Sequence, residues 1–202
     1  MTRRQVVPLV LAGSTLPRFV AGESWISLFD GKTLNGWRAE GNADWSVRDG
    51  CLVGRQGPGG AAGDLFTSAQ WRDFELECEW RMKFPGNSGL WFRVAGPQTG
   101  YQADFLDQPS HPGVLSGSLY CMGKAFIAEN HDAASVKKDG WNSLRVRAQG
   151  DHLVVVLNGK TVADVHDNAF PGPGSAGVQV HAGKDFEGME VRLRKIRIRP
   201  LS

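Results

Sequence analysis

Aromatic and polar side chains recur at every second position in four short segments of the chain. The ones that share a side of these segments are Asn87, Trp91, Arg93, Gln102, Asp104, Tyr120, Gln179 and His181. Since side chains alternate between the two faces of a β-strand, each points away from its apolar neighbours. If the faces coincide, one open sheet face carries rings and planar polar groups. Sugar binding uses this combination, because rings stack on C–H faces while amides, carboxylates and guanidinium groups pair with hydroxyls.

The alternative is a solvated sheet face with scattered polar residues, but a large aromatic such as Trp91 on an open face favours a contact site. His181 is the candidate acid, base or metal ligand, because imidazole titrates near neutral pH. It continues the alternation of Val178 and Val180 and therefore points away from the core, beside Gln179. An ordinary surface histidine is the competing interpretation. The other four histidines fall in expected loops, beside turns or at a strand end: His111, His131, His152 and His166.

Other chemical motifs are absent from the sequence. The glycine-rich stretch 57–63 precedes a predicted strand at residues 64–67 and lacks a Lys-Ser/Thr tail, so it indicates a flexible loop and not a phosphate cradle. Neither a GxSxG nucleophile elbow nor an HExxH zinc motif occurs. Cys51, Cys78 and Cys121 have no metal-site spacing, which favours buried apolar thiols.

The elements that must position these residues are strands. Apolar and polar residues alternate from residue 45 onward, as in residues 74–81, and no segment sustains a helical period. Asn158-Gly159 and Asp49-Gly50 predict tight hairpin turns. The alternation slips by one residue at Arg194-Lys195, which indicates a β-bulge. About ten to twelve closely spaced strands, with at most one helical turn in residues 128–138, predict an antiparallel β-sandwich of jelly-roll type.

The N-terminus resembles a leader segment. Residues 1–22 contain three arginines, with a pair at Arg3-Arg4, then a short apolar stretch and small residues, as in a twin-arginine export signal. We therefore expect a leader at 1–22, a single domain at 23–202, and a periplasmic or secreted protein. The formal net charge is +2, and it becomes −1 without the leader's three arginines, so the basic footprint of a nucleic-acid binder is missing. No apolar run reaches the roughly 18 residues of a membrane-spanning helix.

An ordered set of short motifs resembles the 3-keto-disaccharide hydrolase family over about residues 25–202. The matching segments are Leu28–Trp37, Asp73–Leu76, Asn87–Arg93, Gly100-Tyr101, Leu106-Asp107, Trp141-Asn142, Leu157–Lys160, Gly177–His181 and Ile196–Ile198. Each motif alone is short, but their order along the chain makes the resemblance specific. It implies a concanavalin A-like jelly roll, in agreement with the strand pattern.

The resemblance also implies a reaction, the cleavage of glycosides whose glucose carries a ketone at C3. The ketone acidifies the C2 proton, its loss expels the C1 substituent, and water then adds to the enone. Such a site needs a base, donors for the enolate oxygen, and an acid for the leaving group. On this resemblance His181 is the base or a metal ligand, Arg93 stabilises the enolate oxygen, and Asp104 is the second acid/base. Gln179 and Tyr120 would orient the sugar.

His181 and Asp104 could also hold a divalent ion that polarises the ketone. The expected partners are a sugar substrate and an oxidoreductase that oxidises C3. The family pattern Gly-Tyr-Glu-x-Gln is replaced here by Gly100-Tyr-Gln-Ala-Asp104. The acid has moved two residues, about 6–7 Å along the same strand face. Either the site uses Asp104, or the chain is a non-catalytic carbohydrate-binding module. A structural or adhesive domain is a third alternative.

Overall fold

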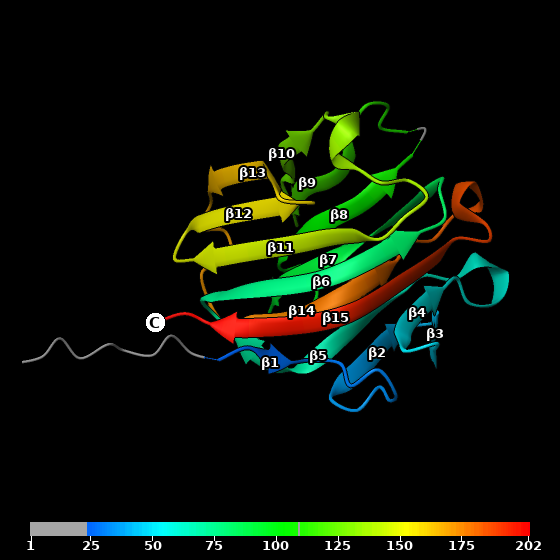
Figure 1. The fold of residues 1–202 in the computed structure, drawn as a ribbon, viewed down its shortest axis with the longest axis horizontal. Coiled ribbons are helices and arrows are strands. Elements are labelled where there is room, and N and C mark those ends of the chain that lie inside the picture. The colour runs from blue at the N-terminus through cyan, green and yellow to red at the C-terminus, as the bar shows by residue number, and fades with distance from the viewer. Residues whose placement is uncertain (1–23, 109) are drawn as a thin grey trace, which may run out of the picture.

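Two antiparallel β-sheets packed face to face make up the part of the chain that the computed structural model describes, residues 24–108 and 110–202 (Figure 1). The predicted jelly-roll sandwich is confirmed. Those residues form fifteen strands, more than the ten to twelve expected, partly because pieces as short as two residues add to the sheets. The leader predicted for residues 1–22 lies outside the described residues.

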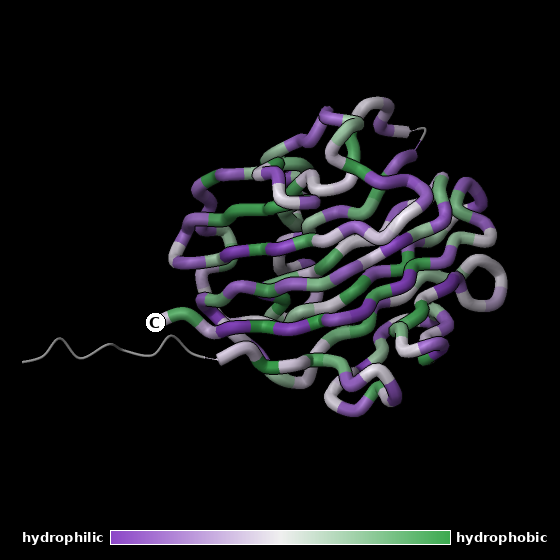
Figure 2. Tube along the Cα trace, viewed as in Figure 1, coloured by the Kyte–Doolittle hydropathy of each residue, from purple (hydrophilic) through white to green (hydrophobic). Residues whose placement is uncertain are grey.

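The larger sheet has eight strands. In spatial order they are β13 (Lys160–His166), β12 (His152–Leu157), β11 (Asn142–Gln149), β6 (Phe74–Met82), β15 (Glu190–Pro200), β4 (Cys51–Arg55) and β3 (Asp44–Arg48), with β1 (Ile26–Ser27) paired to β15. Hydrophobic and hydrophilic residues alternate along its central strands (Figure 2). The apolar ones therefore face the second sheet, and the charged ones face solvent.

The smaller sheet has seven strands and carries the aromatic and polar row. In spatial order they are β10 (Ala125–Asn130), β9 (Leu115–Cys121), β8 (Tyr101–Asp107), β7 (Gly86–Val94), β14 (Gly174–Val180), β5 (Gly63–Trp71) and β2 (Trp37–Gly41). Three single 3₁₀ turns connect strands: η1 (Pro58–Gly60), η2 (Ala133–Ser135) and η3 (Lys184–Phe186). Turn η2 lies in the segment that was expected to hold one helical turn, and η1 lies in the glycine-rich loop.

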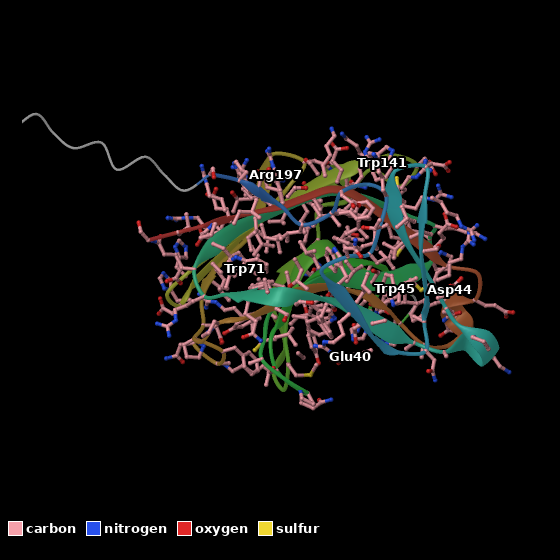
Figure 3. All side chains as sticks on the ribbon, turned by 90° about the horizontal axis from the view of Figure 1, so that it is seen from below. Glu40, Asp44, Trp45, Trp71, Trp141 and Arg197 are labelled. Carbon is pink, nitrogen blue, oxygen red and sulfur yellow. The ribbon has the colours of Figure 1, made fainter. Side chains whose placement is uncertain are left out.

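The core lies between the two sheets. Trp80 of β6 stacks on Phe105 of β8 with ring centroids 4.2 Å apart, and Phe74 meets Phe92 edge-on across the same gap. Large aromatic pairs of this kind dominate the energetics of a core. The three cysteines are free and buried, as the sequence predicted. Side chains on the opposite outer faces separate clearly in the edge view, which labels Arg197 on the larger sheet and Glu40 on the smaller one (Figure 3).

The local turn predictions are confirmed. Asn158-Gly159 and Asp49-Gly50 both have positive φ at their two residues and join paired strands, β12 to β13 and β3 to β4. The bulge predicted at Arg194-Lys195 appears as a register shift in the β15–β6 pair, with a positive φ at Lys195. Within residues 24–108 and 110–202, no helix is of the length and apolar character needed to cross a bilayer.

Candidate functional site

Strand register gathers the predicted residues on the outer face of the smaller sheet. Trp91 of β7 pairs with Gln102 of β8, and Gln102 pairs with Tyr120 of β9. One step along, Gly89 pairs with Asp104. A side chain at position 89 would collide with the Gln102 side chain, since a Cβ there would lie 2.5 Å from its Cγ. The missing side chain at Gly89 therefore leaves room for Gln102 and its neighbours above the sheet.

A cavity of about 510 Å³ opens above this row. Its floor is the sheet, and its walls come from the segments after β8, between β9 and β10, and after β14. The lining residues include seven of the eight predicted site residues: Asn87, Trp91, Gln102, Asp104, Tyr120, Gln179 and His181. The walls explain why residues on an outer sheet face are buried: Trp91, Gln102 and Asp104 are at most 5% exposed.

Asp104 is the most deeply buried carboxyl of the cavity, with 3% of its surface exposed. Burial raises the pKa of Asp104 well above its ordinary value, because no cation compensates the loss of water. With its amide nitrogen turned towards Asp104, the Gln102 side chain donates a hydrogen bond of 2.7 Å to Oδ1. Burial thus favours the protonated form of Asp104, and a protonated carboxyl can donate a proton to a bound molecule.

Trp91 does not form a flat exposed platform. Its ring is 5% exposed and meets Tyr120 edge-on, and its Nε1 donates a 2.8 Å hydrogen bond to Oδ1 of Asp64. Asp64 of β5 pairs with Gln179 of β14. Burial raises the pKa of Asp64 to about 6, and the carboxylate of Glu40 adds to the rise, while the Trp91 hydrogen bond and His181 oppose it. Asp64 therefore titrates close to the physiological range.

His181 lies directly after the end of β14 and lines the same cavity. Its Nδ1 is 2.7 Å from the carbonyl oxygen of Ala182, and its ring meets Phe186 edge-on. A carbonyl oxygen only accepts, so Nδ1 carries the proton and Nε2 holds a free lone pair in the neutral ring. Gln56 donates hydrogen bonds to the carbonyl oxygens of His181 and Gly183, which fix the backbone of this wall.

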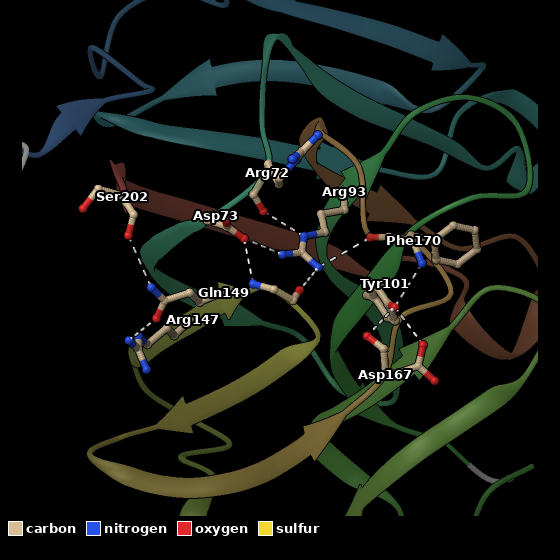
Figure 4. A network of polar contacts seen from close by, with 10 residues as sticks. Arg72, Asp73, Arg93, Tyr101, Arg147, Gln149, Asp167, Phe170 and Ser202 are labelled. Carbon is tan, nitrogen blue, oxygen red and sulfur yellow. Dashed lines mark hydrogen bonds and ion pairs between the residues drawn. The ribbon is translucent and has the colours of Figure 1, made fainter.

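The expectation that Arg93 shares this face is wrong. Its Nε, Nη1 and Nη2 donate to Arg72 O, Gly150 O and Asp73 Oδ1 at 2.8, 2.8 and 3.0 Å (Figure 4). Arg93 is not among the residues that line the cavity. Its φ is +54°, and the β14–β7 register shifts beside it, so strand alternation breaks between Trp91 and Arg93. Arg93 is consequently a buried residue that stabilises the fold by connecting Arg72, Asp73 and Gly150, and it supplies no hydrogen-bond donor to the cavity.

Several polar residues near the row were missed as candidates by the sequence analysis, and Asp64 and His111 are two of them. Asp64 lies in the strand predicted at residues 64–67 and shares the parity of the exposed face, but only the long-range register brings it beside Gln179. His111 was placed in a loop, and the structure folds that loop over the cavity, which His111 lines. The spacing of a loop residue carries no information about what it contacts, so no signal in a single sequence identifies His111.

The donor set does not form a complete metal centre. In residues 24–108 and 110–202, no group of three or more His, Cys, Asp or Glu side chains could hold a metal ion. His181 and Asp104 would offer two ligands at most, and burial favours the protonated form of Asp104, which is a poor ligand.

A larger hollow, of about 930 Å³, lies on the outer face of the eight-stranded sheet. Its charged groups are paired with one another: Glu77 accepts from Arg145 and Arg197, and Glu79 from Lys195. Arg197 also covers the ring of Trp25. These cross-strand ion pairs lie on a solvent-facing surface, and their charged groups are already paired with one another and not directed at a ligand. The cavity over the smaller sheet is the better candidate. Within the described residues, its Asp104 carboxyl has no cationic partner and Nε2 of its His181 ring makes no hydrogen bond.

Comparison with known proteins places the chain in a family. The family model described as "3-keto-alpha-glucoside-1,2-lyase-like domain" matches residues 24–199. A 3-keto-disaccharide hydrolase of Bacteroides thetaiotaomicron is 39% identical over 129 residues, which are 59% of this chain and 43% of the relative. The match thus spans less than half of the relative's length.

Solved structures share the fold at lower identity. A candidate glycosyl hydrolase from Parabacteroides distasonis has a TM-score of 0.66 at 22% identity and covers 88% of this chain and 94% of its own. A carbohydrate-binding module from Bacillus subtilis has a TM-score of 0.65 at 21% identity, with 81% and 95% covered. These two likenesses establish the sandwich and are silent on its activity.

Proposed function

Because the chain belongs to the family of 3-keto-alpha-glucoside-1,2-lyase-like domains, we propose that it cleaves the glycosidic bond of 3-keto-glucosides or 3-keto-disaccharides by elimination and hydration. The observation that carries the proposal is one cavity that holds both an imidazole, His181, whose Nε2 makes no hydrogen bond within the described residues, and a buried carboxyl, Asp104, whose burial favours its protonated form. An imidazole and a carboxyl in such different surroundings are suited to act as base and acid in one site.

In the first step His181 Nε2 takes the proton from C2, and the electron pair of that C–H bond moves to form the enolate of the C3 ketone. The positive charge that His181 gains is favoured by Asp64, whose own pKa is lowered by the charge of His181. A carboxylate beside an imidazole stabilises the imidazolium form in this way. Asp64 thus supports the base without contacting the sugar.

In the second step the enolate reforms the ketone, the C1–C2 double bond forms, and the C1–O bond breaks. Asp104 gives its proton to the departing oxygen. Water then adds across the C1–C2 double bond to give the free 3-keto sugar, and the net reaction is hydrolysis. Gln102 remains bonded to Asp104 throughout and holds its carboxyl in place. General acid catalysis of this kind contributes about 10²–10⁴-fold in rate.

The remaining cavity residues are suited to hold the sugar. Trp91 of β7 and Tyr120 of β9 present aromatic surface on either side of β8, and Gln179 and Asn87 present amides. The buried position of Trp91 inside a cavity argues for an enclosed site and against the flat aromatic platform of a binding module. A carbohydrate-binding module on this fold remains the competing function, as an outcome of the experiment below.

Three further proposals accompany this function. A C3 ketone arises by oxidation of a C3 hydroxyl, so a sugar 3-oxidoreductase is the functional partner that the chemistry requires. Residues 1–22 are proposed as an export signal that places the protein in the periplasm or outside the cell. The third proposal is a divalent ion bound by His181 and Asp104, and the chelation experiment described next tests it.

The test incubates the full-length protein with 3-keto-trehalose and, in parallel, with trehalose, and follows the released sugars by chromatography. Cleavage of the keto sugar alone is the expected result. Absence of cleavage, with 3-keto-trehalose still bound in calorimetry, would assign the protein to the carbohydrate-binding modules. The same assay after chelation, with Mg²⁺, Ca²⁺ or Zn²⁺ returned, shows whether a metal ion takes part.

A further inference from the structure

The proposed reaction requires a donor for the enolate oxygen, and Arg93 cannot supply it. His111 lines the cavity whose other wall carries His181. The ring of His111 meets Phe126 of β10 edge-on with centroids 5.7 Å apart, and its Nδ1 lies 2.8 Å from Nε2 of Gln108. Two contacts therefore hold an otherwise exposed ring in place. Among the residues that the structure describes, none bonds the other nitrogen, Nε2.

A relay of amides sets the position of the proton on His111. In the structure Asn87 Nδ2 donates a 2.9 Å hydrogen bond to Gln108 Oε1, so the oxygen of the Gln108 amide faces Asn87. The Gln108 atom that faces His111 is therefore the NH₂ group, which only donates. It follows that Nδ1 of His111 accepts and that Nε2 carries the proton. Ser110 Oγ, 3.1 Å from the same Nδ1, can donate to it as well.

In their neutral forms, the two histidines of the cavity therefore differ at Nε2: it carries a lone pair in His181 and a proton in His111. His181 donates a hydrogen bond from Nδ1–H to Ala182 O and has a lone pair on Nε2, whereas His111 accepts a hydrogen bond at Nδ1 and has its proton on Nε2. One is a base, and the other is a neutral hydrogen-bond donor. A neutral imidazole is well suited to polarise a carbonyl, because it donates without first giving up a charge.

We propose that His111 Nε2–H donates a hydrogen bond to the C3 oxygen of the keto sugar and stabilises the enolate that His181 generates, with Gln108 as the positioning residue that sets the tautomer. The inference rests on the proposed function and adds the group that it lacked. No proton leaves His111 during the step: the C2 proton goes to His181, the C2–H electron pair goes to the enolate, and Asp104 protonates the leaving oxygen.

Exchange of the C2 proton in D₂O separates His111 from Asp104, because exchange reports enolate formation before the C1–O bond breaks. By NMR with 3-keto-trehalose, His111→Ala is expected to slow both exchange and cleavage by about 10²-fold, the usual effect of losing one oxyanion donor. His111→Asn, which retains an N–H, is expected to recover part of the loss. Gln108→Ala leaves the tautomer unset and is expected to slow exchange about 10-fold.

Two controls make the outcome decisive. His166→Ala removes an exposed histidine of the β12–β13 hairpin, outside the cavity, and is expected to exchange and cleave like the wild type. Exchange in His111→Ala within threefold of the wild-type rate would overturn the role of His111 while leaving the proposed function intact. Wild-type protein that neither exchanges the C2 proton nor cleaves the sugar would overturn both.

Discussion

Arg93 and Asp104 lie on the paired strands β7 and β8 and are almost equally buried, with 1% and 3% of their surfaces exposed. Their surroundings differ completely. Four acceptors surround the Arg93 guanidinium, namely Asp73 Oδ1 and three carbonyl oxygens (Figure 4). The Asp104 carboxyl has one amide donor and no cation.

This difference separates a charge that supports the fold from a group held ready for chemistry. A buried charge with every donor satisfied contributes rigidity, and removing it leaves its partners unpaired. A buried carboxyl without a counter-charge costs stability and is retained where its altered pKa is useful. The cavity and the Arg93 network should therefore respond in opposite ways to mutation.

The largest effect is expected at Arg93. Arg93→Ala strips partners from the Asp73 carboxyl and from three backbone carbonyls, and loss of one partner of a buried pair costs about 3–5 kcal/mol. The free energy of unfolding, measured in urea, should fall by that amount, while kcat per folded molecule on 3-keto-trehalose stays near that of the wild type. Arg93→Lys should lose less, because one ammonium can keep the Asp73 contact.

A stable but inactive Arg93→Ala protein would contradict this assignment and return Arg93 to the site.

The reverse pattern is expected at Asp104. Asp104→Asn keeps the shape and the hydrogen bond from Gln102 but has no acidic proton, so kcat on 3-keto-trehalose should fall about 10³-fold. The free energy of unfolding at neutral pH should not fall, because an amide can be buried without the proton uptake that the carboxyl requires on folding. A substrate with a 4-nitrophenolate leaving group needs no proton and should recover most of the rate. Equal losses on both substrates would remove Asp104 from the role of acid.

The same two residues show what the sequence could predict. Period-2 alternation placed Trp91, Gln102 and Asp104 on one face, because nothing interrupts β8 and the first part of β7. It failed at Arg93, where a positive φ reverses the direction of the side chain. Gly174, 81 positions along the chain, packs against this point so closely that a Cβ there would lie 2.3 Å from the Arg93 carbonyl carbon. Arginine itself carries no sign of this conformation.

For the other site residues, the sequence could not predict which residues become neighbours, because strands far apart in sequence pair with each other. Asp64 lies beside Gln179 only because β5 and β14 pair, and the two strands are more than a hundred residues apart in sequence. Hairpins with short turns, such as β12–β13, were predictable because Asn158-Gly159 fixes their pairing locally. Sequence patterns thus predict which face a residue takes and not which residues become its neighbours across the sheet.

The smallest effect on the free energy of unfolding is expected at Asp64, the second carboxyl with a raised pKa. Its pKa is raised from 3.8 to about 6 in the folded protein. A carboxyl whose pKa rises on folding binds its proton more tightly in the native state. The stability it contributes is therefore fully present below pH 3.8 and is lost as the pH rises through about 6. Asp64→Asn keeps an acceptor for Trp91 Nε1 but does not titrate.

Relative to the wild type, Asp64→Asn should therefore gain up to about 3 kcal/mol between pH 4 and pH 8, since one pKa unit corresponds to about 1.4 kcal/mol. Urea unfolding at both pH values measures the gain. Activity should fall at the same time, because the imidazolium of His181 loses a neighbouring carboxylate. If the gain in the free energy of unfolding did not depend on pH, the ionised Asp64 carboxylate would not destabilise the fold. Asp104 would then be the one carboxyl of the two whose burial differs in kind from that of Arg93.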